Sequence, residues 1–463
     1  MPVRVLPARL AALALAASCI ATLAPATGPA MGRAIGQSQP TDATPPAPTV
    51  QVGTAPVAAP APRSWPTLNT AAPRRDLAPR LAKVLTDTPE IPGIGAAIIR
   101  DGALVALGVA GTRSKDSTTP VLPTDHWHLG SCTKAFTATL AAILVEDGVI
   151  TFDTTLAQSF PELVPGMSPH WPDITLAQLF SNSAGITGDM RAGGLWSRLW
   201  NHAGPEYLAR WHALETMAAR ASDAPPGTKH IYSNAGFTFA GLMLERATGR
   251  PYDSLIAKHL FAPLGITDPV WGVAGADTAQ DAKTPATIWG HTRAGKPFMP
   301  ARNADNPPAI SPAGRVSLTL EDWARFVNLH LIGHRAAFPP AAPTTAAPSA
   351  TAPPATAPPA TAPPATAPPA TGLLPQTVRT LHTPPIAGTD YAFGWVVQPL
   401  PGLGTTLWHN GSNTTWYAFM RFAPEHNAAT IVAVNIASPG ATKAVSQLVE
   451  ELLRTELNIA KPD

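Results

Sequence analysis

The sequence predicts an α/β (α+β) fold, in which an antiparallel sheet is flanked by helices and a helical lobe lies beside it. Near the start, two apolar runs joined by a turn signal predict a β-hairpin. Near the end, three segments alternate apolar and polar residues as antiparallel strands do. Because the chain between them shows helical apolar spacing, we expect one sheet assembled from both ends of the chain.

The hairpin is predicted from Ile94–Ile99 and Leu104–Val109, with Asp101-Gly102 as its turn. A helix is predicted from Ser131 to Asp147, because its apolar residues recur on one face and Gly148 follows as a stop signal. Further helices are predicted at Glu206–Arg220, Ala235–Thr248, Leu320–Leu331 and Thr442–Leu457. The C-terminal strands are predicted at Thr405–His409, Trp416–Phe422 and Thr430–Ile436.

Residues 1–30 have the features of a signal peptide. Arg4 and Arg9 precede an apolar run from Leu10 to Leu23 that is too short to span a bilayer, which needs about 20 residues. The small residues Ala24-Pro25-Ala26 suit cleavage by a signal peptidase. We therefore expect an exported protein, either periplasmic or secreted.

The segment Ala16-Ala17-Ser18-Cys19 loosely resembles a bacterial lipobox, although Ala16 stands where leucine is usual. Two alternatives remain open at this point: Cys19 is removed with the signal peptide, or it is lipidated and anchors the protein to a membrane as a lipoprotein. In either case Cys132 is left without an intrachain disulfide partner. Stability is then expected to come from burial in a large core.

Two segments are rich in proline, alanine and threonine and cannot form a packed core. The first is a predicted linker at 31–75, and the second is a low-complexity insertion at about 339–371 that contains repeats of Ala-Pro-Pro-Ala-Thr. The remaining chain, 76–463, is expected to form one catalytic domain interrupted by that insertion.

The charge balance excludes a polybasic nucleic-acid binder, because 32 Lys and Arg stand against 30 Asp and Glu. With 45% hydrophobic residues, the chain can still bury a core. His126 and His128 flank Trp127, but no recognisable metal motif accompanies them, and no dinucleotide or phosphate-binding loop appears. We therefore expect no metal and no organic cofactor.

Three short motifs carry the candidate chemistry. Ser131-Cys132-Thr133-Lys134 opens a helix, where residues i and i+3 share a face and the lysine amine can reach the serine hydroxyl. A serine becomes a good nucleophile when a neighbouring base takes its proton. Cys132 is the alternative nucleophile, but it lies on a different face from Lys134.

The second motif is Tyr232-Ser233-Asn234, which precedes an apolar helix. Its tyrosine could shuttle a proton and its asparagine amide could orient a substrate carbonyl, although the same pattern fits a turn before an Asn-capped helix. The third motif, His409-Asn410-Gly411-Ser412, ends a predicted strand. There the backbone amides of Ser131 and Ser412 could form an oxyanion hole.

In this order the three motifs resemble the serine penicillin-recognising superfamily: class C β-lactamases, DD-peptidases, D-aminopeptidases and β-lactamase-like carboxylesterases. The stretch Trp127–Lys134 resembles the family's approach to its nucleophile. Leu176–Ile186 is similar to its "LLSHTSGL" segment, with Asn182 where histidine is usual. Pro312–Ser317 resembles its "PAGGLVST" segment, and the likeness covers roughly 76–335 and 373–460.

The resemblance implies a β-lactamase/transpeptidase-like fold and an acyl-transfer mechanism. Ser131 would carry the acyl group, while Lys134 and Tyr232 would move its proton and later activate water. The residues implied in substrate binding are Asn234, His409, Gly411 and Ser412.

His409 replaces the lysine of most β-lactamases, so we expect weak binding of a carboxylate-bearing β-lactam near neutral pH. The expected substrate is therefore a cell-wall (peptidoglycan-type) D-amino-acid peptide or a small ester, with β-lactams as an alternative. A non-catalytic sensor or scaffold with the same fold is the alternative from another class. Intact Ser131, Lys134 and Tyr232 argue against it. The sequence sets no oligomeric state.

Overall fold

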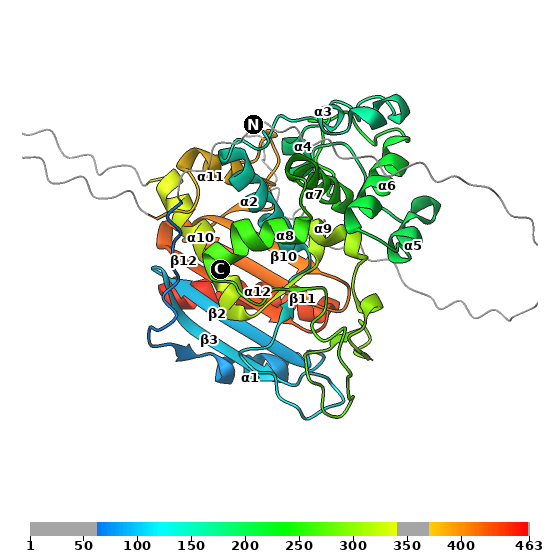
Figure 1. Ribbon diagram of the computed structural model, residues 1–463. Coiled ribbons are helices and arrows are strands. Elements are labelled where there is room, and N and C mark those ends of the chain that lie inside the picture. The colour runs from blue at the N-terminus through cyan, green and yellow to red at the C-terminus, as the bar shows by residue number, and fades with distance from the viewer. Residues whose placement is uncertain (1–62, 340–369, 462–463) are drawn as a thin grey trace, which may run out of the picture. The chain divides into compact units, whose positions relative to one another are not determined.

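The computed structural model describes residues 63–339 and 370–461 (Figure 1). The predicted signal peptide with Cys19, most of the predicted linker and nearly all of the repeat insertion lie outside the described residues. Within the described ranges, no helix is long and apolar enough to cross a membrane.

A seven-stranded sheet joins both ends of the described chain, in the order β1-β3-β2-β12-β11-β10-β9. Its strands are β1 (Arg75–Asp76), β2 (Gly93–Arg100), β3 (Ala103–Gly111), β9 (Val396–Leu400), β10 (Gly404–Ser412), β11 (Tyr417–Ala423) and β12 (Ala428–Val434). Only β1 and β3 pair in parallel, and β12 pairs with β2. The predicted antiparallel sheet built from both termini is therefore confirmed.

The β2–β3 hairpin turns at the predicted dipeptide. Asp101 and Gly102 both have positive φ, at 51° and 76°, which is the backbone of a tight two-residue hairpin turn. Asp and Gly tolerate this left-handed region better than other residues do. The register of the hairpin follows from this turn, with Arg100 opposite Ala103.

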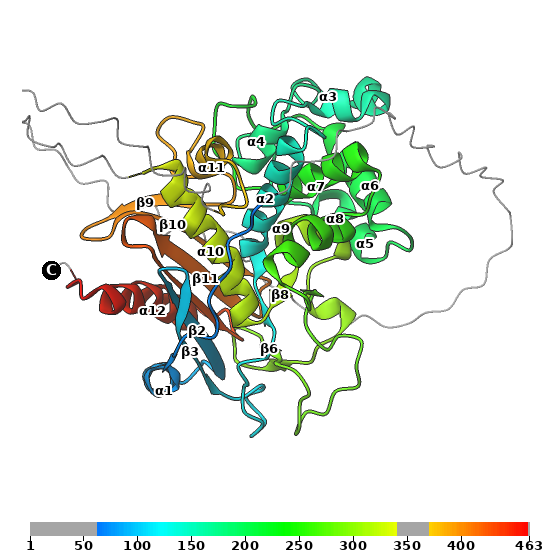
Figure 2. The same cartoon turned by 60° about the vertical axis from the view of Figure 1, so that its left-hand side comes forward.

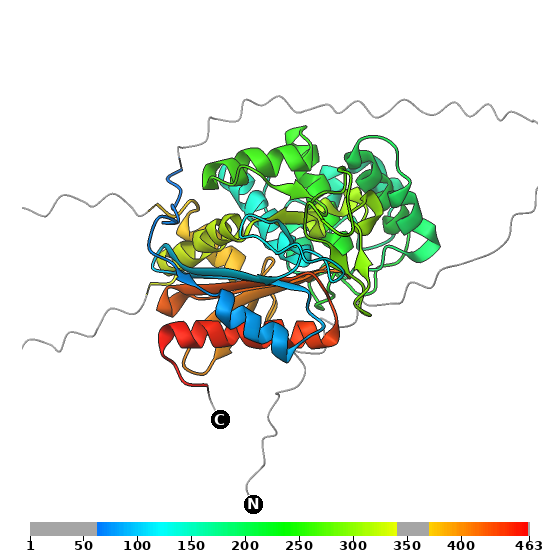
Figure 3. The ribbon, with the colours of Figure 1, turned by 90° about the horizontal axis from the view of Figure 1, so that it is seen from below.

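Helices cover both faces of the sheet (Figure 3). On one face lie α1 (Ala78–Asp87) and α12 (Pro439–Leu457), which pack on Ile98 and Val432. On the other face lie α2 (Thr133–Glu146) and α10 (Leu320–Ala337), which share a core with Ile99 and Ile431. Because both faces are covered, every residue of β11 and β12 is buried, although alternating sequence patterns predicted these two strands.

The helical lobe lies beyond α2, on the side away from α12 (Figure 2). Its helices are α3 (Leu156–Ser159), α4 (Leu176–Phe180), α5 (Leu195–Trp200), α6 (Glu206–Ala218), α7 (Asn234–Thr248), α8 (Tyr252–Ile256) and α9 (Ser311–Gly314). Helix α11 (Pro375–His382) packs on α10 and α2. Two small sheets are formed by β4 (Trp127–His128), β8 (Val316–Leu318) and β5 (Val270–Trp271), and by β6 (Gly290–His291) and β7 (Pro297–Phe298).

Residues 63–75 belong to the folded body, whereas the sequence predicted a linker through residue 75. Arg63 forms ion pairs with Glu146 and Asp147 at the end of α2. Leu68 is buried, and Asn69 bridges to Ala103. Pro66 and Pro73 lie within this segment, but its other residues make these contacts with the body, which composition alone does not reveal.

Candidate active site

Ser131 lies in a 3-10 turn, Gly130–Cys132, that leads directly into α2. The apolar residues of α2 anchor this turn, because every residue of the helix from Thr133 to Leu144 is buried, and Phe136 and Leu140 are fully buried. Ser131 is half-buried, whereas its neighbour Cys132 is completely buried. The serine hydroxyl is therefore the more accessible of the two candidate nucleophiles.

Burial also opposes thiol chemistry at Cys132. Removal from solvent raises the pKa of the Cys132 thiol far above its ordinary value, against a smaller opposing effect of the nearby Lys134 charge. The thiol lies 3.5 Å from the carbonyl oxygen of His409, inside the contact between α2 and the sheet. Cys132 therefore has the environment of a packed side chain.

Lys134 lies one helical turn after Ser131, and its side chain is fully buried. Its Nζ is 3.2 Å from Ser131 Oγ, 2.7 Å from Asn234 Oδ1 and 2.8 Å from the carbonyl oxygen of Ala313. The asparagine and carbonyl oxygens are pure acceptors, so they each take one N–H of the amine. This arrangement fixes the amine directly beside the serine hydroxyl.

The tyrosine motif is held in place by a helix cap. Ser233 caps α7, with its Oγ accepting from Gly236 N at 2.9 Å, and so Asn234 begins the helix with its side chain near Lys134. Asn182 supports the motif from the other side, because its Oδ1 accepts from Ser233 N at 3.0 Å and its carbonyl accepts from Ile231 N at 2.7 Å. Asn182 has φ of 55°, a left-handed conformation that asparagine tolerates well.

Tyr232 joins the first and third motifs. Lys134 Nζ lies 4.7 Å from the centroid of the Tyr232 ring, within range of a cation–π contact. The same ring lies 6.4 Å from the ring of His409, centroid to centroid. The three motifs, which are far apart in the sequence, thus form one cluster in space.

Two glycines let the nucleophile turn and strand β10 meet backbone to backbone. A Cβ at position 411 would lie 2.0 Å from Leu129 O and 2.5 Å from Ser131 N. A Cβ at position 130, where φ is +50°, would lie 2.3 Å from Ser412 N. Any side chain larger than hydrogen at either position would separate the two backbones. The amides of Ser131 and Ser412 therefore lie at one junction.

His409 is buried, at 3% exposure, and its hydrogen bonds fix its tautomer. Its Nδ1 lies 2.6 Å from the carbonyl oxygen of Asn410, which can only accept, so Nδ1 carries the proton. Nε2 therefore accepts from the hydroxyl of Tyr391 at 3.0 Å. Burial, helped by the charge of Lys134 and opposed by the Asn410 carbonyl, lowers the pKa of His409 to about 3. His409 is neutral at physiological pH.

The structure thus brings all seven residues that the sequence singled out into one cluster. It also contains contributors that sequence reasoning missed, namely the carbonyl of Ala313 and the side chain of Tyr391. A backbone carbonyl leaves no signal in a sequence, and Tyr391 reaches His409 from a loop without a motif. Asn182 was noted only as a departure from a family segment, and its role at Ser233 follows from its contacts.

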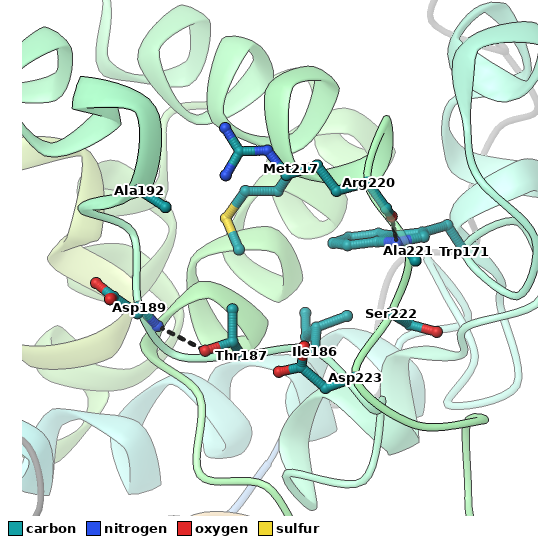
Figure 4. Close-up of a pocket in the computed structure, with 10 residues that line it drawn as sticks. All are labelled: Trp171, Ile186, Thr187, Asp189, Ala192, Met217, Arg220, Ala221, Ser222 and Asp223. Carbon is teal, nitrogen blue, oxygen red and sulfur yellow. Dashed lines mark hydrogen bonds between the residues drawn. The ribbon is translucent and has the colours of Figure 1, made fainter.

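A small pocket lies beside the tyrosine motif (Figure 4). Ile186, Met217 and Trp171 form its apolar part, and charged residues including Asp189 and Arg220 stand around it. Ser233 Oγ lies 3.2 Å from the carbonyl oxygen of Thr187, which lines this pocket. None of the seven predicted site residues lines it, so it neighbours the cluster without containing it. In the described part of the chain, no group of three or more His, Cys, Asp or Glu side chains is arranged to hold a metal ion.

The chain is similar to known proteins in both sequence and fold. The chain is 26% identical over 398 residues to penicillin-binding protein 4 of Amycolatopsis lactamdurans, a match covering 81% of this chain and 88% of that protein. It is also 26% identical over 245 residues to an unguisins hydrolase of Aspergillus violaceofuscus, covering 52% of this chain and 42% of that one.

Among solved structures, the fold is similar to that of the octameric penicillin-binding protein homologue from Pyrococcus abyssi. The TM-score is 0.61 at 19% identity, and the match covers 82% of this chain and 76% of that one. A family model described as Beta-lactamase matches residues 80–453. The chain therefore belongs to the beta-lactamase family of serine hydrolases.

Proposed function

We propose that this protein is an exported serine hydrolase that works through a covalent Ser131 acyl-enzyme on D-amino-acid peptides or esters. The observation that carries the proposal is the position of Lys134 Nζ, 3.2 Å from Ser131 Oγ and held by two further acceptors. In the proposed mechanism Lys134 reacts as the neutral amine, which donates two hydrogen bonds and keeps one lone pair. With Asn234 and Ala313 taking both N–H groups, that lone pair is left to accept the proton of the Ser131 hydroxyl.

The proposed acylation forms a bond between Ser131 Oγ and the substrate carbonyl carbon. The hydroxyl proton passes to Lys134, and Tyr232 relays a proton to the leaving group as its bond to the carbonyl carbon breaks. The negative charge that develops on the carbonyl oxygen is stabilised by the amides of Ser131 and Ser412. Deacylation repeats these steps with water as the nucleophile and releases the acid.

Because His409 is neutral, the site favours substrates whose leaving side carries no negative charge. A lysine at this position would supply a permanent charge for a carboxylate, whereas buried His409 supplies none near pH 7 because its pKa is about 3. Its Nε2 is also occupied by the Tyr391 hydroxyl. β-Lactams carry a carboxylate on that side, so the proposal ranks them below esters and amides.

The proposal is tested by turnover of an uncharged p-nitrophenyl ester. We expect wild type and Cys132→Ala to hydrolyse it, whereas Ser131→Ala loses all turnover above background. Retained turnover in Ser131→Ala, or loss in a folded Cys132→Ala, would reassign the nucleophile. No turnover by wild type would instead favour a non-catalytic binding protein of the same fold.

A matched pair of peptides tests the substrate class. An N-acylated D-Ala-D-Ala is compared with the same peptide carrying a C-terminal amide, so that the two differ only in one carboxylate. We expect the amide form to be cleaved at least as fast, because His409 brings no positive charge to the site. A preference of about tenfold or more for the free carboxylate would contradict this and indicate a cation at that position.

A further inference from the structure

A buried carboxylate, Asp305, contacts three segments that the proposed mechanism needs in register. Its side chain is only 1% exposed. Oδ1 lies 2.9 Å from His128 Nε2 and 3.1 Å from Asn413 Nδ2, while Oδ2 lies 3.0 Å from Arg315 Nε. None of these residues belongs to the three catalytic motifs.

The contact with His128 reaches the nucleophile turn. His128 Nδ1 lies 3.1 Å from the backbone N–H of Gly130, and this N–H can only donate, so Nδ1 is the acceptor and the ring proton sits on Nε2. This nitrogen lies 2.9 Å from Asp305 Oδ1, a close polar contact rather than an aligned hydrogen bond. A chain of polar contacts therefore runs from Asp305 through His128 to the residue immediately before Ser131.

The contact with Asn413 reaches the other side of the same junction. Asn413 follows Ser412, is 6% exposed, and uses its Oδ1 to accept from the N–H and hydroxyl of Thr415. With Nδ2 bound to Asp305 and Oδ1 bound to Thr415, the Asn413 side chain has a single orientation. This fixes the backbone directly after the Ser412 amide.

The third contact reaches the acceptor of Lys134. Arg315 follows α9, whose residue Ala313 provides the carbonyl that accepts from Lys134 Nζ. Burial alone would raise the pKa of Asp305, but its contacts with His128 and Arg315 outweigh burial and lower it to about 2. Asp305 is thus ionised throughout the working range of a hydrolase.

We propose that Asp305 is a positioning residue, which sets the spacing between the Ser131 amide, the Ser412 amide and the Ala313 carbonyl. This inference rests on the proposed function. All three segments contact the same carboxylate. A displacement of any one segment is therefore resisted by the contacts that Asp305 makes with the other two. Catalysis is sensitive to such spacing, since a shift of about 1 Å can cost on the order of 100-fold in rate.

The test is Asp305→Asn, which preserves shape but replaces one acceptor oxygen with a donor that must face His128 or Arg315. We expect kcat for a p-nitrophenyl ester to fall on the order of 100-fold, with KM changed by less than about threefold. Binding of phenylboronic acid should weaken in parallel. The Ser131 oxygen adds to boron and gives a tetrahedral adduct whose oxygen occupies the oxyanion position, so this inhibitor reports the spacing directly.

The matched control is Glu245→Gln. Glu245 is also buried, at 5% side-chain exposure, and forms a two-point ion pair with Arg210 at 2.6 and 2.8 Å, outside the proposed catalytic machinery. We expect this variant to lose stability while keeping kcat and boronate affinity. If Asp305→Asn behaves like Glu245→Gln in both readouts, Asp305 is merely structural and the proposal is wrong.

If Asp305→Asn fails to fold, Asn413→Ala is tested in its place, because this variant removes one of the three contacts of Asp305. A kcat and boronate affinity within about twofold of wild type would then overturn the proposal, and a parallel loss of both would support it. A wild-type protein that neither turns over the ester nor binds the boronate refutes the proposed function itself, and with it this role of Asp305.

Discussion

Three buried histidines form a hydrogen-bonded chain between α10 and α11. Their burial predicts that the protein loses stability in acid. His330 Nδ1 lies 2.9 Å from His382 Nε2, and His382 Nδ1 lies 3.1 Å from His334 Nδ1. At the inner end, His330 Nε2 lies 2.9 Å from the hydroxyl of Thr139. That hydroxyl donates its single proton to Ala135 O at 2.7 Å, so it must accept from His330.

This fixes every proton in the chain. His330 carries its proton on Nε2, so its Nδ1 accepts from His382 Nε2–H, and His382 Nδ1 accepts from His334 Nδ1–H. An added proton on either inner ring would place two N–H groups face to face. Burial, with a smaller contribution from His334, lowers the pKa of His330 to about 3, and burial lowers that of His334 to about 4. The pKa of His382 is also lowered, mainly by burial.

The sign of the pH effect follows from proton counting. The folded-state pKa values lie below the ordinary value of 6.5, so the unfolded chain binds more protons once the pH falls below 6.5. Stability is therefore fully present above this value and is lost as the pH falls toward 4. Between pH 7.5 and 5.5 each such histidine removes about 1.4 kcal/mol from the free energy of unfolding. The three together remove about 4 kcal/mol, a large fraction of a typical total.

The perturbation is His334→Gln at the outer end of the chain. Glutamine can still donate to His382 but does not titrate, so the variant should lose about 1.4 kcal/mol less than wild type between pH 7.5 and 5.5. Urea unfolding at the two pH values measures this difference. His212→Gln, at an exposed position on α6, controls for the exchange of side chain. Equal pH dependence in wild type and His334→Gln would refute the reasoning.

The remaining predictions concern the active site. Gly411→Ala should lower ester turnover by about 100- to 1000-fold, because its Cβ would press on Leu129 O and Ser131 N and open the oxyanion hole. Steady-state kinetics with unchanged circular dichroism would establish this, and near-normal turnover would contradict the assigned junction. Lys134→Gln should lower kcat by about 100- to 10,000-fold while KM stays near wild type, because glutamine donates hydrogen bonds but is not a base. A variant with normal kcat would remove Lys134 from the mechanism.

The sheet and the main helices could be predicted because their signals are local. The Asp101-Gly102 turn lies between two apolar runs, and α2 carries its apolar face within a few turns. The end of the predicted linker could not be placed from composition. Arg63 finds its partners on α2, some 80 residues away, and such a contact leaves no local pattern.

The same distinction between local signals and long-range contacts applies to the site. Its three motifs could be read from the sequence because helix spacing and strand ends place Ser131, Lys134 and Gly411 without long-range information. The neutrality of His409 could only be anticipated in part, because it depends on burial and on Tyr391, which arrives from another loop. Asp305 was invisible to sequence reasoning, since its partners are spread over almost 300 residues and meet only in the fold.

The measurement that tests the central claim most directly is the intact mass of the protein after brief exposure to a p-nitrophenyl ester and, separately, to a penicillin. We expect wild type to gain the mass of the acyl group from the ester, and Ser131→Ala to gain none. A slower gain with penicillin would fit the neutral His409. A well-folded wild-type protein with no adduct and no turnover, or an adduct that persists in Ser131→Ala, would contradict the account.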